Sequence, residues 1–203
     1  MTASVACWFD YASPYAYLGT ARVEAVATRT GAEVQFEPFL LGALFKRVGT
    51  PIVPMRAYPA AKSRHLAADL YRYADVYEVP FRFTTHFPIH TVSALRLTLA
   101  APDALRTPLV HRLMRAAWVE DRPLADVEVL TACAEEVGLP ESALEAVTTP
   151  AIKQRLREQT ERAIDLGMPG APCFVVGEHV YWGQDRLQLV ARALEGRPPR
   201  ESP

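Results

Sequence analysis

The strand patterns of this 203-residue chain lie only near its two ends, and this distribution limits the possible folds most strongly. Residues 4–9 alternate apolar and small side chains, which is typical of a short strand. Residues 33–37 alternate polar and apolar side chains, as a half-buried strand does. A helical pattern over residues 14–29 separates the two strands. Because a β-α-β unit normally closes by a right-handed crossover, we expect these strands to be parallel.

The C-terminal end of the chain predicts a second pair of strands. Strand patterns over residues 173–177 and 178–182 meet at Gly177-Glu178, a dipeptide that favours a hairpin turn. A final helix is expected over residues 185–195, where apolar residues recur at helical spacing.

The middle of the chain predicts helices without strands. Helical patterns cover residues 61–79, 90–101, 104–121, 126–137 and 150–166, so the block from about 62 to 166 is expected to be all-helical. Residues 42–59 carry three prolines and two glycines, and we therefore expect a loop or linker there.

This order of elements predicts an α/β fold in which a four-stranded sheet is divided by a helical insertion. It is the thioredoxin-like architecture in its DsbA-like arrangement. We expect residues 1–41 and 167–196 to form the thioredoxin-like domain, residues 42–166 to form the linker and helical insertion, and residues 197–203 to form a disordered tail.

Composition excludes several classes of partner. The formal net charge is −1 and no basic run occurs, so a nucleic-acid partner is not expected. No segment reaches the roughly 18 apolar residues of a membrane span. The first apolar stretch has no basic residues ahead of it, unlike a signal peptide, so we expect a cytoplasmic protein.

The cysteines and histidines indicate neither a disulfide framework nor a metal site. Cys7, Cys133 and Cys173 form no C-x-x-C pair, and we expect them to be small buried apolar residues. His86 and His90 are four residues apart, but a proline lies between them and no third ligand is near, so we expect no metal.

Ser13 has two possible roles, because it lies where the first strand gives way to a helix that starts at Pro14. It can simply cap the helix. It can also stabilise a thiolate at the positive helix end by donating a hydrogen bond. Lowering a thiol pKa from about 8.5 by about two units requires about 2.7 kcal/mol. A charge-assisted hydrogen bond together with a helix end can supply that.

Several segments together resemble one enzyme family. They are "FDYASPYAYL" after the first strand, "PFLLGALFK" after the second, "FP" before a mid-chain helix, and "GMPGAPCFVVGEHVYWGQDRL" near the end. Over about residues 4–195 the chain resembles 2-hydroxychromene-2-carboxylate isomerases, which belong to the DsbA-like superfamily and are close to kappa-class glutathione transferases.

The resemblance implies that the chain uses an external thiol. Dithiol oxidoreductases of this superfamily have cysteine at both ends of a C-x-x-C motif, whereas this chain has Ser13 and Ala16 there. Disulfide exchange through the motif is therefore excluded. The family implies glutathione as the cofactor, and another small thiol is a possible substitute.

The resemblance also implies how the thiol is held. Ala171-Pro172 corresponds to the cis peptide bond that faces the active-site helix, and its backbone is expected to pair with the cysteinyl part of glutathione. Gly183, Gln184 and Asp185 are expected to hold the γ-glutamyl end, with Asp185 taking the ammonium group. The alternative for Asp185 is a helix cap.

Further residues are expected around the substrate. Lys46 and, more weakly, Lys62 are expected to face an anionic substrate. Thr50 stands where the family commonly has an asparagine that helps to hold the cofactor or substrate. Four residues are expected to form the walls: Tyr15, Phe87, Pro88 and Trp182.

The predicted activity is a glutathione-dependent cis/trans-type isomerisation of 2-hydroxychromene-2-carboxylate or a related unsaturated aromatic hydroxy-acid. Thiolate addition, bond rotation and elimination would divide one difficult step into easier ones. The alternatives are a kappa-like glutathione transferase or peroxidase, and a non-catalytic DsbA-like binding module. The family also suggests a homodimer.

Overall fold

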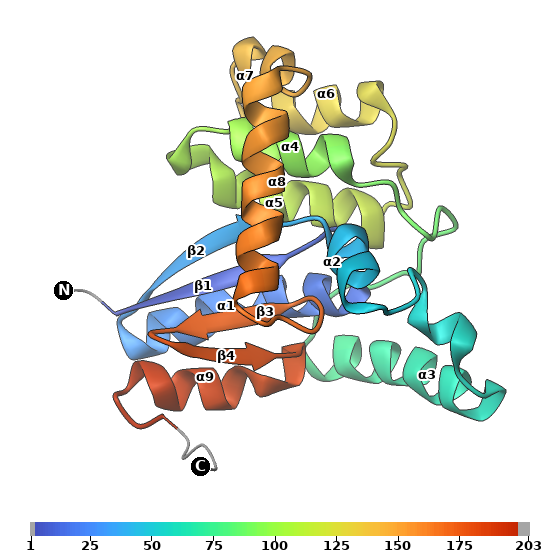
Figure 1. Cartoon of the computed structure of the whole chain (residues 1–203), viewed down its shortest axis with the longest axis vertical. Helices are drawn as coiled ribbons and strands as arrows, with labels where there is room; N and C mark the ends of the chain where they lie inside the picture. The colour runs from blue at the N-terminus through green and yellow to red at the C-terminus, as the bar shows by residue number, and fades with distance from the viewer. Residues whose placement is uncertain (1–2, 199–203) are drawn as a thin grey trace.

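The computed structural model describes residues 3–198 and contains a four-stranded sheet with helices on both faces (Figure 1). The strands are β1 (Ser4–Phe9), β2 (Glu33–Pro38), β3 (Cys173–Val176) and β4 (His179–Trp182). Their order is β2-β1-β3-β4, with β1 parallel to β2 and β3 antiparallel to both β1 and β4. The predicted parallel pair, the C-terminal hairpin and the thioredoxin-like fold are therefore confirmed.

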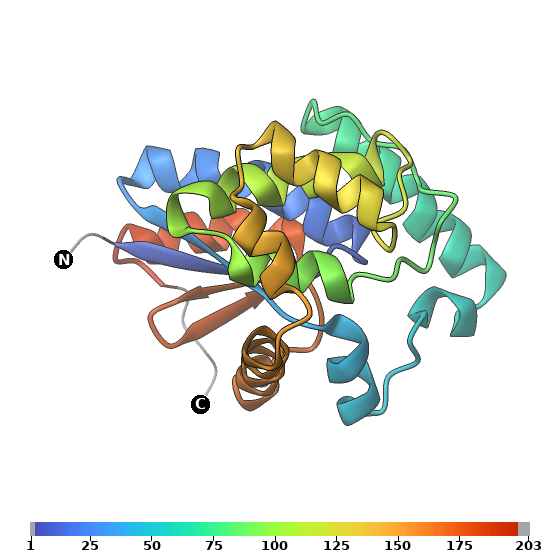
Figure 2. The same cartoon turned by 90° about the horizontal axis from the view of Figure 1, so that it is seen from above.

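The helices form layers around this sheet. They are α1 (Pro14–Thr30), α2 (Leu41–Val48), α3 (Ala60–Val76), α4 (Val92–Ala100), α5 (Asp103–Trp118), α6 (Val127–Glu136), α7 (Glu141–Ala146), α8 (Pro150–Asp165) and α9 (Leu187–Leu194), with 3₁₀ helices η1 (Pro54–Ala57) and η2 (Gln184–Arg186). α1 and α9 pack together on one face of the sheet, and α8 lies on the other (Figure 2). α4 to α7 group beyond the β2 side of the sheet (Figure 1). The helical insertion between the two halves of the sheet is as predicted.

A hydrophobic cluster joins the insertion to the sheet. Phe9 of β1, Leu18 of α1, Leu113 of α5 and Val190 of α9 are fully buried members of this cluster. The apolar face that the sequence predicts for α5 is buried, because the helical spacing turns these side chains toward the sheet.

The first part of the predicted linker is helical, so the loop prediction for residues 42–59 is wrong there. Leu41 and Leu44 of α2 are buried against the core, and the helix ends at Gly49 with a φ of 75°. The prolines of the segment all follow this end. Residues 42–59 therefore contain a short amphipathic helix followed by a proline-rich stretch, and the prolines do not describe the whole segment.

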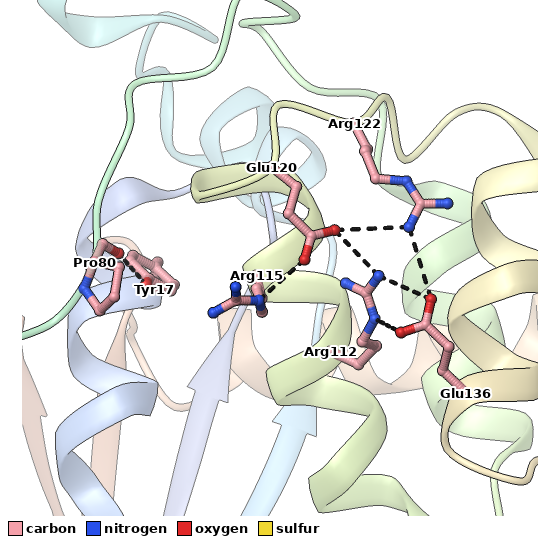
Figure 3. Close-up of polar contacts among 7 residues, drawn as sticks. All are labelled: Tyr17, Pro80, Arg112, Arg115, Glu120, Arg122 and Glu136. Atoms are coloured by element: carbon pink, nitrogen blue, oxygen red, sulfur yellow. Dashed lines mark hydrogen bonds and ion pairs between the residues drawn. The ribbon is translucent and has the colours of Figure 1, made fainter.

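An ion-pair network holds α5 against α6 (Figure 3). Arg112 of α5 donates to Glu136 of α6 at 2.6 Å and to Glu120 at 3.1 Å. Arg115 and Arg122 also pair with Glu120. Because Arg112 is largely buried and its hydrogen bonds are charge-assisted, this network is expected to contribute more than an isolated surface pair.

Other predictions concern the termini and membranes. Among residues 3–198, no helix combines the length and the apolar character that crossing a membrane requires. Residues 199–203, most of the tail for which disorder is predicted, lie outside the described residues.

Candidate active site

Four segments of the chain meet at one end of the sheet. Because β1 and β2 are parallel, the residues that follow Phe9 and Pro38 lie at the same end. Trp8 pairs with Cys173, which pairs in turn with Trp182, so the segments before β3 and after β4 also reach this end. Ligands of open α/β sheets bind outside the carboxyl ends of the strands. We therefore place the candidate active site here.

Ser13 lies in the turn between β1 and α1 and is only 5% exposed. Its Oγ accepts a hydrogen bond from the Ala16 N–H at 3.1 Å, so Ser13 caps α1 as the sequence predicts. Its hydroxyl also donates to the Ala171 carbonyl oxygen at 2.9 Å. The serine therefore connects the start of α1 to the segment before β3.

The first turn of α1 offers a binding site for an anion. Pro14 has no N–H, and the Ala16 and Tyr17 N–H groups bond to the side chain and carbonyl of Ser13. Among the described residues, the Tyr15 N–H has no backbone or side-chain acceptor. This donor and the positive end of α1 would therefore both act on a negative group beside Ser13.

The Ala171-Pro172 segment faces the start of α1, and its peptide bond is cis as predicted. The Pro172 carbonyl oxygen accepts from the Gly183 N–H at 3.0 Å, which connects this segment to the end of β4. The Ala171 N–H has no backbone acceptor in the part of the chain that the structure describes. An unpaired N–H at this edge can bond to an extended peptide-like ligand.

Gly19 sets how closely α1 approaches Pro172. A Cβ at Gly19 would lie 2.9 Å from Pro172 Cγ and 3.1 Å from Phe174 Cζ. We expect Gly19→Ala to lower the free energy of unfolding by about 1–3 kcal/mol, because the proline ring cannot yield to the extra atom.

Gly42 of α2 provides the matched control for this prediction. A Cβ there would meet only Ile52 Cδ1, at an ordinary 3.8 Å. We expect Gly42→Ala to raise the free energy of unfolding by about 0.5–1 kcal/mol, the usual helix preference of alanine. Urea unfolding of both variants checks this, and shifts of the same sign would contradict it.

Asp10 holds the turn that carries Ser13. The carboxylate is buried, with one oxygen accepting from the Ala12 N–H at 3.0 Å and the other from the Leu41 N–H at 2.8 Å. Burial raises the pKa of Asp10, although the hydrogen bonds it accepts oppose that shift. Asp10 therefore joins the end of β1 to the start of α2.

Replacing Asp10 by asparagine tests this connection. The amide accepts on only one side, so a backbone N–H loses its acceptor, and we expect Asp10→Asn to cost about 1–3 kcal/mol in acid. Because the folded-state pKa of Asp10 is raised, the folded protein keeps a proton on Asp10 at pH values where the unfolded chain has released it. The free energy of unfolding of the wild type therefore falls as the pH rises through that pKa. The stability difference between wild type and variant should therefore shrink as the pH rises above about 4, and a growing difference in urea unfolding would contradict this.

A cavity of about 570 Å³ opens beside Ser13. Apolar side chains of the β2–α2 region and the loops around it form much of its wall; they include Leu40, Leu41, Phe45, Ile52, Val53 and Ile89. Cavities of this size and character accept small organic ligands. The apolar side therefore suits an aromatic or unsaturated compound.

Polar residues line the other part of the cavity. Asp69 and Tyr73 come from α3, and Gln184, Asp185 and Arg186 form η2. Asp185 forms an ion pair with Arg186 and makes no capping hydrogen bond to η2 or α9. The interpretation of Asp185 as a helix cap is therefore wrong, and the residue is part of the cavity lining.

Tyr15 adds a hydroxyl group that has no partner. Its side chain lines the cavity, yet its buried hydroxyl oxygen has no hydrogen-bond partner among the described residues. Burial raises the pKa of Tyr15, and nearby Asp69 adds to the shift. Tyr15 therefore stays protonated at neutral pH and can donate to a ligand.

The three cysteines are free and buried, which confirms their predicted structural character. Cys173 is closest in sequence to the site, and its Sγ donates to the Gly170 carbonyl oxygen at 3.2 Å. Burial raises the pKa of Cys173 to about 12. Because a thiol, unlike a thiolate, is a poor nucleophile, Cys173 is not placed to replace an external thiol.

The family comparison matches nearly the whole chain. Residues 4–195 match the DSBA-like thioredoxin domain. A 2-hydroxychromene-2-carboxylate isomerase from Sphingobium xenophagum is 31% identical over 198 residues, which cover 96% of this chain and 99% of that protein. The chain belongs to the 2-hydroxychromene-2-carboxylate isomerase family.

Further relatives include a second isomerase of the same name and a kappa-class glutathione transferase. The enzyme of the same name from Pseudomonas sp. (strain C18) is 28% identical over 94% of this chain and 90% of that protein. Human glutathione S-transferase kappa 1 is 27% identical over 94% of this chain and 90% of that protein. The solved structure of a 2-hydroxychromene-2-carboxylate isomerase superposes with a TM-score of 0.81 at 24% identity, covering 94% of both chains, which supports the fold.

Most residues that the family resemblance predicts lie together at the cavity. The lining residues among them are Ser13, Tyr15, Phe87, Pro88, Ala171, Trp182, Gly183, Gln184 and Asp185. Pro172 follows Ala171 in the chain and is not itself part of the lining. The Phe87-Pro88 bond is also cis, which the sequence analysis did not predict.

Besides Pro172, three predicted residues are not part of the cavity lining. Lys46 is exposed on α2, and Lys62 Nζ lies 3.9 Å from the centre of the Tyr58 ring. The Thr50 N–H bonds to the Phe45 carbonyl oxygen at 2.9 Å, so Thr50 closes the end of α2. The isomerase-family roles expected for these side chains have no support from their positions here.

Sequence reasoning missed Asp69, His90 and Arg186, which also line the cavity. Arg186 directly follows Asp185, so its position in "GQDRL" was an available signal. Asp69 precedes Tyr73 by four residues, which places both on one side of α3. In residues 3–198, no three His, Cys, Asp or Glu side chains are grouped to hold a metal ion.

Proposed function

We propose that this chain is a glutathione-dependent isomerase of 2-hydroxychromene-2-carboxylate or a related unsaturated aromatic hydroxy-acid. One observation carries the proposal. The Ser13 hydroxyl lies at the N-terminus of α1 and lines a largely apolar cavity, while Ala16 occupies the position at which a dithiol enzyme has its second cysteine.

The residues of the cavity fit glutathione on structural grounds. The Ala171 N–H, two residues before β3, has no backbone acceptor in the described chain and is available to a peptide-like ligand. Asp185 presents a carboxylate that no helix uses as a cap, and this suits an ammonium group. The cavity volume lies within the range of about 300–1,000 Å³ that is typical of small-molecule sites.

Each residue has a defined part in this mechanism. When bound beside Ser13, glutathione would supply a thiolate nucleophile for reversible addition to the unsaturated carbon, which would permit rotation about the former double bond. Ser13 turns its hydroxyl hydrogen from the Ala171 carbonyl toward the sulfur and stabilises the anion. The Tyr15 N–H and the α1 dipole add to that stabilisation.

The substrate side of the cavity is proposed to work through burial and charge. The apolar residues of the β2–α2 region hold the aromatic part of the substrate and exclude water. Tyr15 donates its free hydroxyl to a substrate oxygen. Arg186, which pairs with Asp185, lines the cavity whereas Lys46 does not, so Arg186 is the proposed partner of the substrate carboxylate.

Calorimetric titration with glutathione tests the cofactor, and a turnover assay with 2-hydroxychromene-2-carboxylate tests the reaction. We expect binding at millimolar glutathione and turnover that depends on glutathione without consuming it. Absence of binding would contradict the cofactor assignment. Binding without turnover of this compound would contradict the substrate assignment.

The second candidate is a kappa-like transferase or peroxidase, favoured by the matches to kappa transferases over most of the chain. A transferase releases a stable conjugate and consumes glutathione stoichiometrically, so product analysis separates it from an isomerase. A non-catalytic DsbA-like binding module would leave the pKa of bound glutathione unchanged. A homodimer in the cytoplasm remains a prediction from the sequence and the family.

A further inference from the structure

The Tyr15 hydroxyl is a buried donor without a partner close to Ser13. Bulk water does not reach its oxygen, and none of residues 3–198 supplies a hydrogen-bond partner for it. The Tyr15 side chain nevertheless lines the cavity of about 570 Å³, and it comes from the first turn of α1. A buried polar group without a partner calls for an explanation, and a catalytic task is one of the usual ones.

The groups around Tyr15 keep its hydroxyl protonated. Burial raises the pKa of Tyr15 most, and the charge of Asp69 is the next cause. Tyr58, Asp185 and Tyr73 shift this pKa in the same direction. A tyrosinate formed here would therefore recover a proton readily. Tyr15 is suited to give up its proton briefly and to take it back.

The proposed reaction creates an oxygen atom that needs such a proton. Opening of the 2-hydroxychromene ring, a cyclic hemiketal, gives a 2-oxo acid whose carbonyl group is conjugated with the double bond. When a thiolate adds to the far carbon of that double bond, an electron pair moves through the conjugated system onto the carbonyl oxygen. Negative charge therefore develops at this oxygen, where a donor from the protein stabilises it.

We propose that Tyr15 is the general acid and base of the isomerisation, giving its hydroxyl proton to this carbonyl oxygen and recovering it as the thiolate leaves. The transfer produces a tyrosinate and a neutral enol, in which the former double bond is single and free to rotate. Return of the proton to the tyrosinate restores the hydroxyl of Tyr15, the carbonyl group and the double bond. No proton, electron or thiol is consumed.

This inference rests on the function proposed above and narrows its substrate class. The reacting double bond must be conjugated with a carbonyl group, because the proton needs an oxygen that receives the displaced electron pair. An unsaturated acid without that carbonyl group would gain nothing from Tyr15.

The dimensions of the site agree with the transfer. Bond lengths place the carbonyl oxygen about 4–5 Å from the sulfur that is bonded to the far carbon. Ser13 and Tyr15 lie about 3 Å apart along the axis of α1. The enclosed hydroxyl has to turn toward the ligand, and it gains there a hydrogen bond that it lacks in the free protein.

Calorimetry with two inert compounds tests the contact between Tyr15 and the carbonyl oxygen. In 4-(2-hydroxyphenyl)-2-oxobutanoate the carbonyl is present but the double bond is not, and 4-(2-hydroxyphenyl)butanoate lacks both. With glutathione present, the wild type should bind the first compound about tenfold more tightly, and Tyr15→Phe should bind both equally. Equal binding of the two compounds by the wild type would overturn the proposal without the use of any variant.

Kinetics separate a proton transfer from a hydrogen bond alone. Tyr15→Phe should lower kcat about 100-fold or more. The pKa of bound glutathione should stay as in the wild type, because phenylalanine keeps the backbone N–H at this position. Single turnover by the wild type should be slower in D₂O than in H₂O, and Tyr15→Phe should lose this difference. Tyr71→Phe, at a half-exposed tyrosine outside the cavity lining, should stay within about twofold of the wild type.

Two kinetic results would overturn the role of Tyr15. Turnover of Tyr15→Phe at the wild-type rate would show that no proton from Tyr15 is needed. A loss of turnover that leaves the D₂O effect unchanged would show that Tyr15 only positions the substrate. If the wild type itself shows no glutathione-dependent turnover, the function proposed above fails instead, and this inference fails with it.

Discussion

Replacing Ser13 by alanine is expected to lower turnover by about 10- to 100-fold, because the bound thiolate loses one charge-assisted hydrogen bond. The pKa of glutathione bound to the variant should rise toward its free value. Ultraviolet absorbance of the thiolate, followed against pH, measures this pKa directly. Unchanged pKa values in wild type and variant would contradict the role assigned to Ser13.

Two further variants separate the thiolate role from the capping role. Ser13→Gly also removes the hydroxyl, but glycine is nearly as good a cap as serine and costs only a few tenths of a kcal/mol. Its turnover should therefore fall as far as that of Ser13→Ala while its stability is largely kept. Thr149→Ala removes the corresponding cap of α8, far from the cavity, and should lower stability by about 1 kcal/mol without changing turnover.

Replacing Trp118 by alanine is expected to lower the free energy of unfolding by about 3–5 kcal/mol, the largest stability change predicted here. Trp118 is fully buried at the end of α5, and its Nε1 donates to the Tyr11 carbonyl oxygen at 2.9 Å. Its ring packs against Phe81 at 6.0 Å and Phe83 at 5.7 Å between ring centres. Alanine would leave both a cavity and an unpaired carbonyl next to the Ser13 turn.

Urea unfolding measures this loss and compares it with two controls. Trp118→Phe keeps an aromatic ring but removes the donor to Tyr11, so it should cost less, about 1–3 kcal/mol. Trp182→Ala makes the same substitution at a tryptophan that is 55% exposed and should cost less than about 1 kcal/mol. Equal losses in Trp118→Ala and Trp182→Ala would contradict the importance of the Trp118 contacts.

The Trp118 contacts also connect the helical insertion to the candidate active site. Phe81 stacks on Tyr17 of α1, and Phe83 packs against Phe87, which lines the cavity. The Tyr17 hydroxyl donates to the Pro80 carbonyl oxygen (Figure 3). The same aromatic cluster therefore supports both the helix that carries Ser13 and one wall of the cavity. A change in the insertion that preserves folding can still alter substrate binding.

The sequence by itself was sufficient for the local features. Alternation and helical spacing are properties of neighbouring residues, so the β-α-β start, the final hairpin and the cap at Ser13 followed from local order. The absence of a second cysteine at Ala16 is likewise visible in the chain alone. The helix α2 was missed because its amphipathic pattern spans only two turns before the prolines begin.

Only the tertiary structure decided which side chains share the site. Asp185 does not cap a helix, because η2 already starts at Gln184 and its N-cap residue is Gly183, which has no side chain. Lys46 follows the second strand as expected, but the direction of α2 leaves it exposed. Arg22, Gln184 and Asp185 line one cavity because α1 and η2 pack together, although more than 160 positions separate Arg22 from the other two in the chain. Sequence spacing records local geometry, whereas contacts between distant segments depend on how whole elements pack.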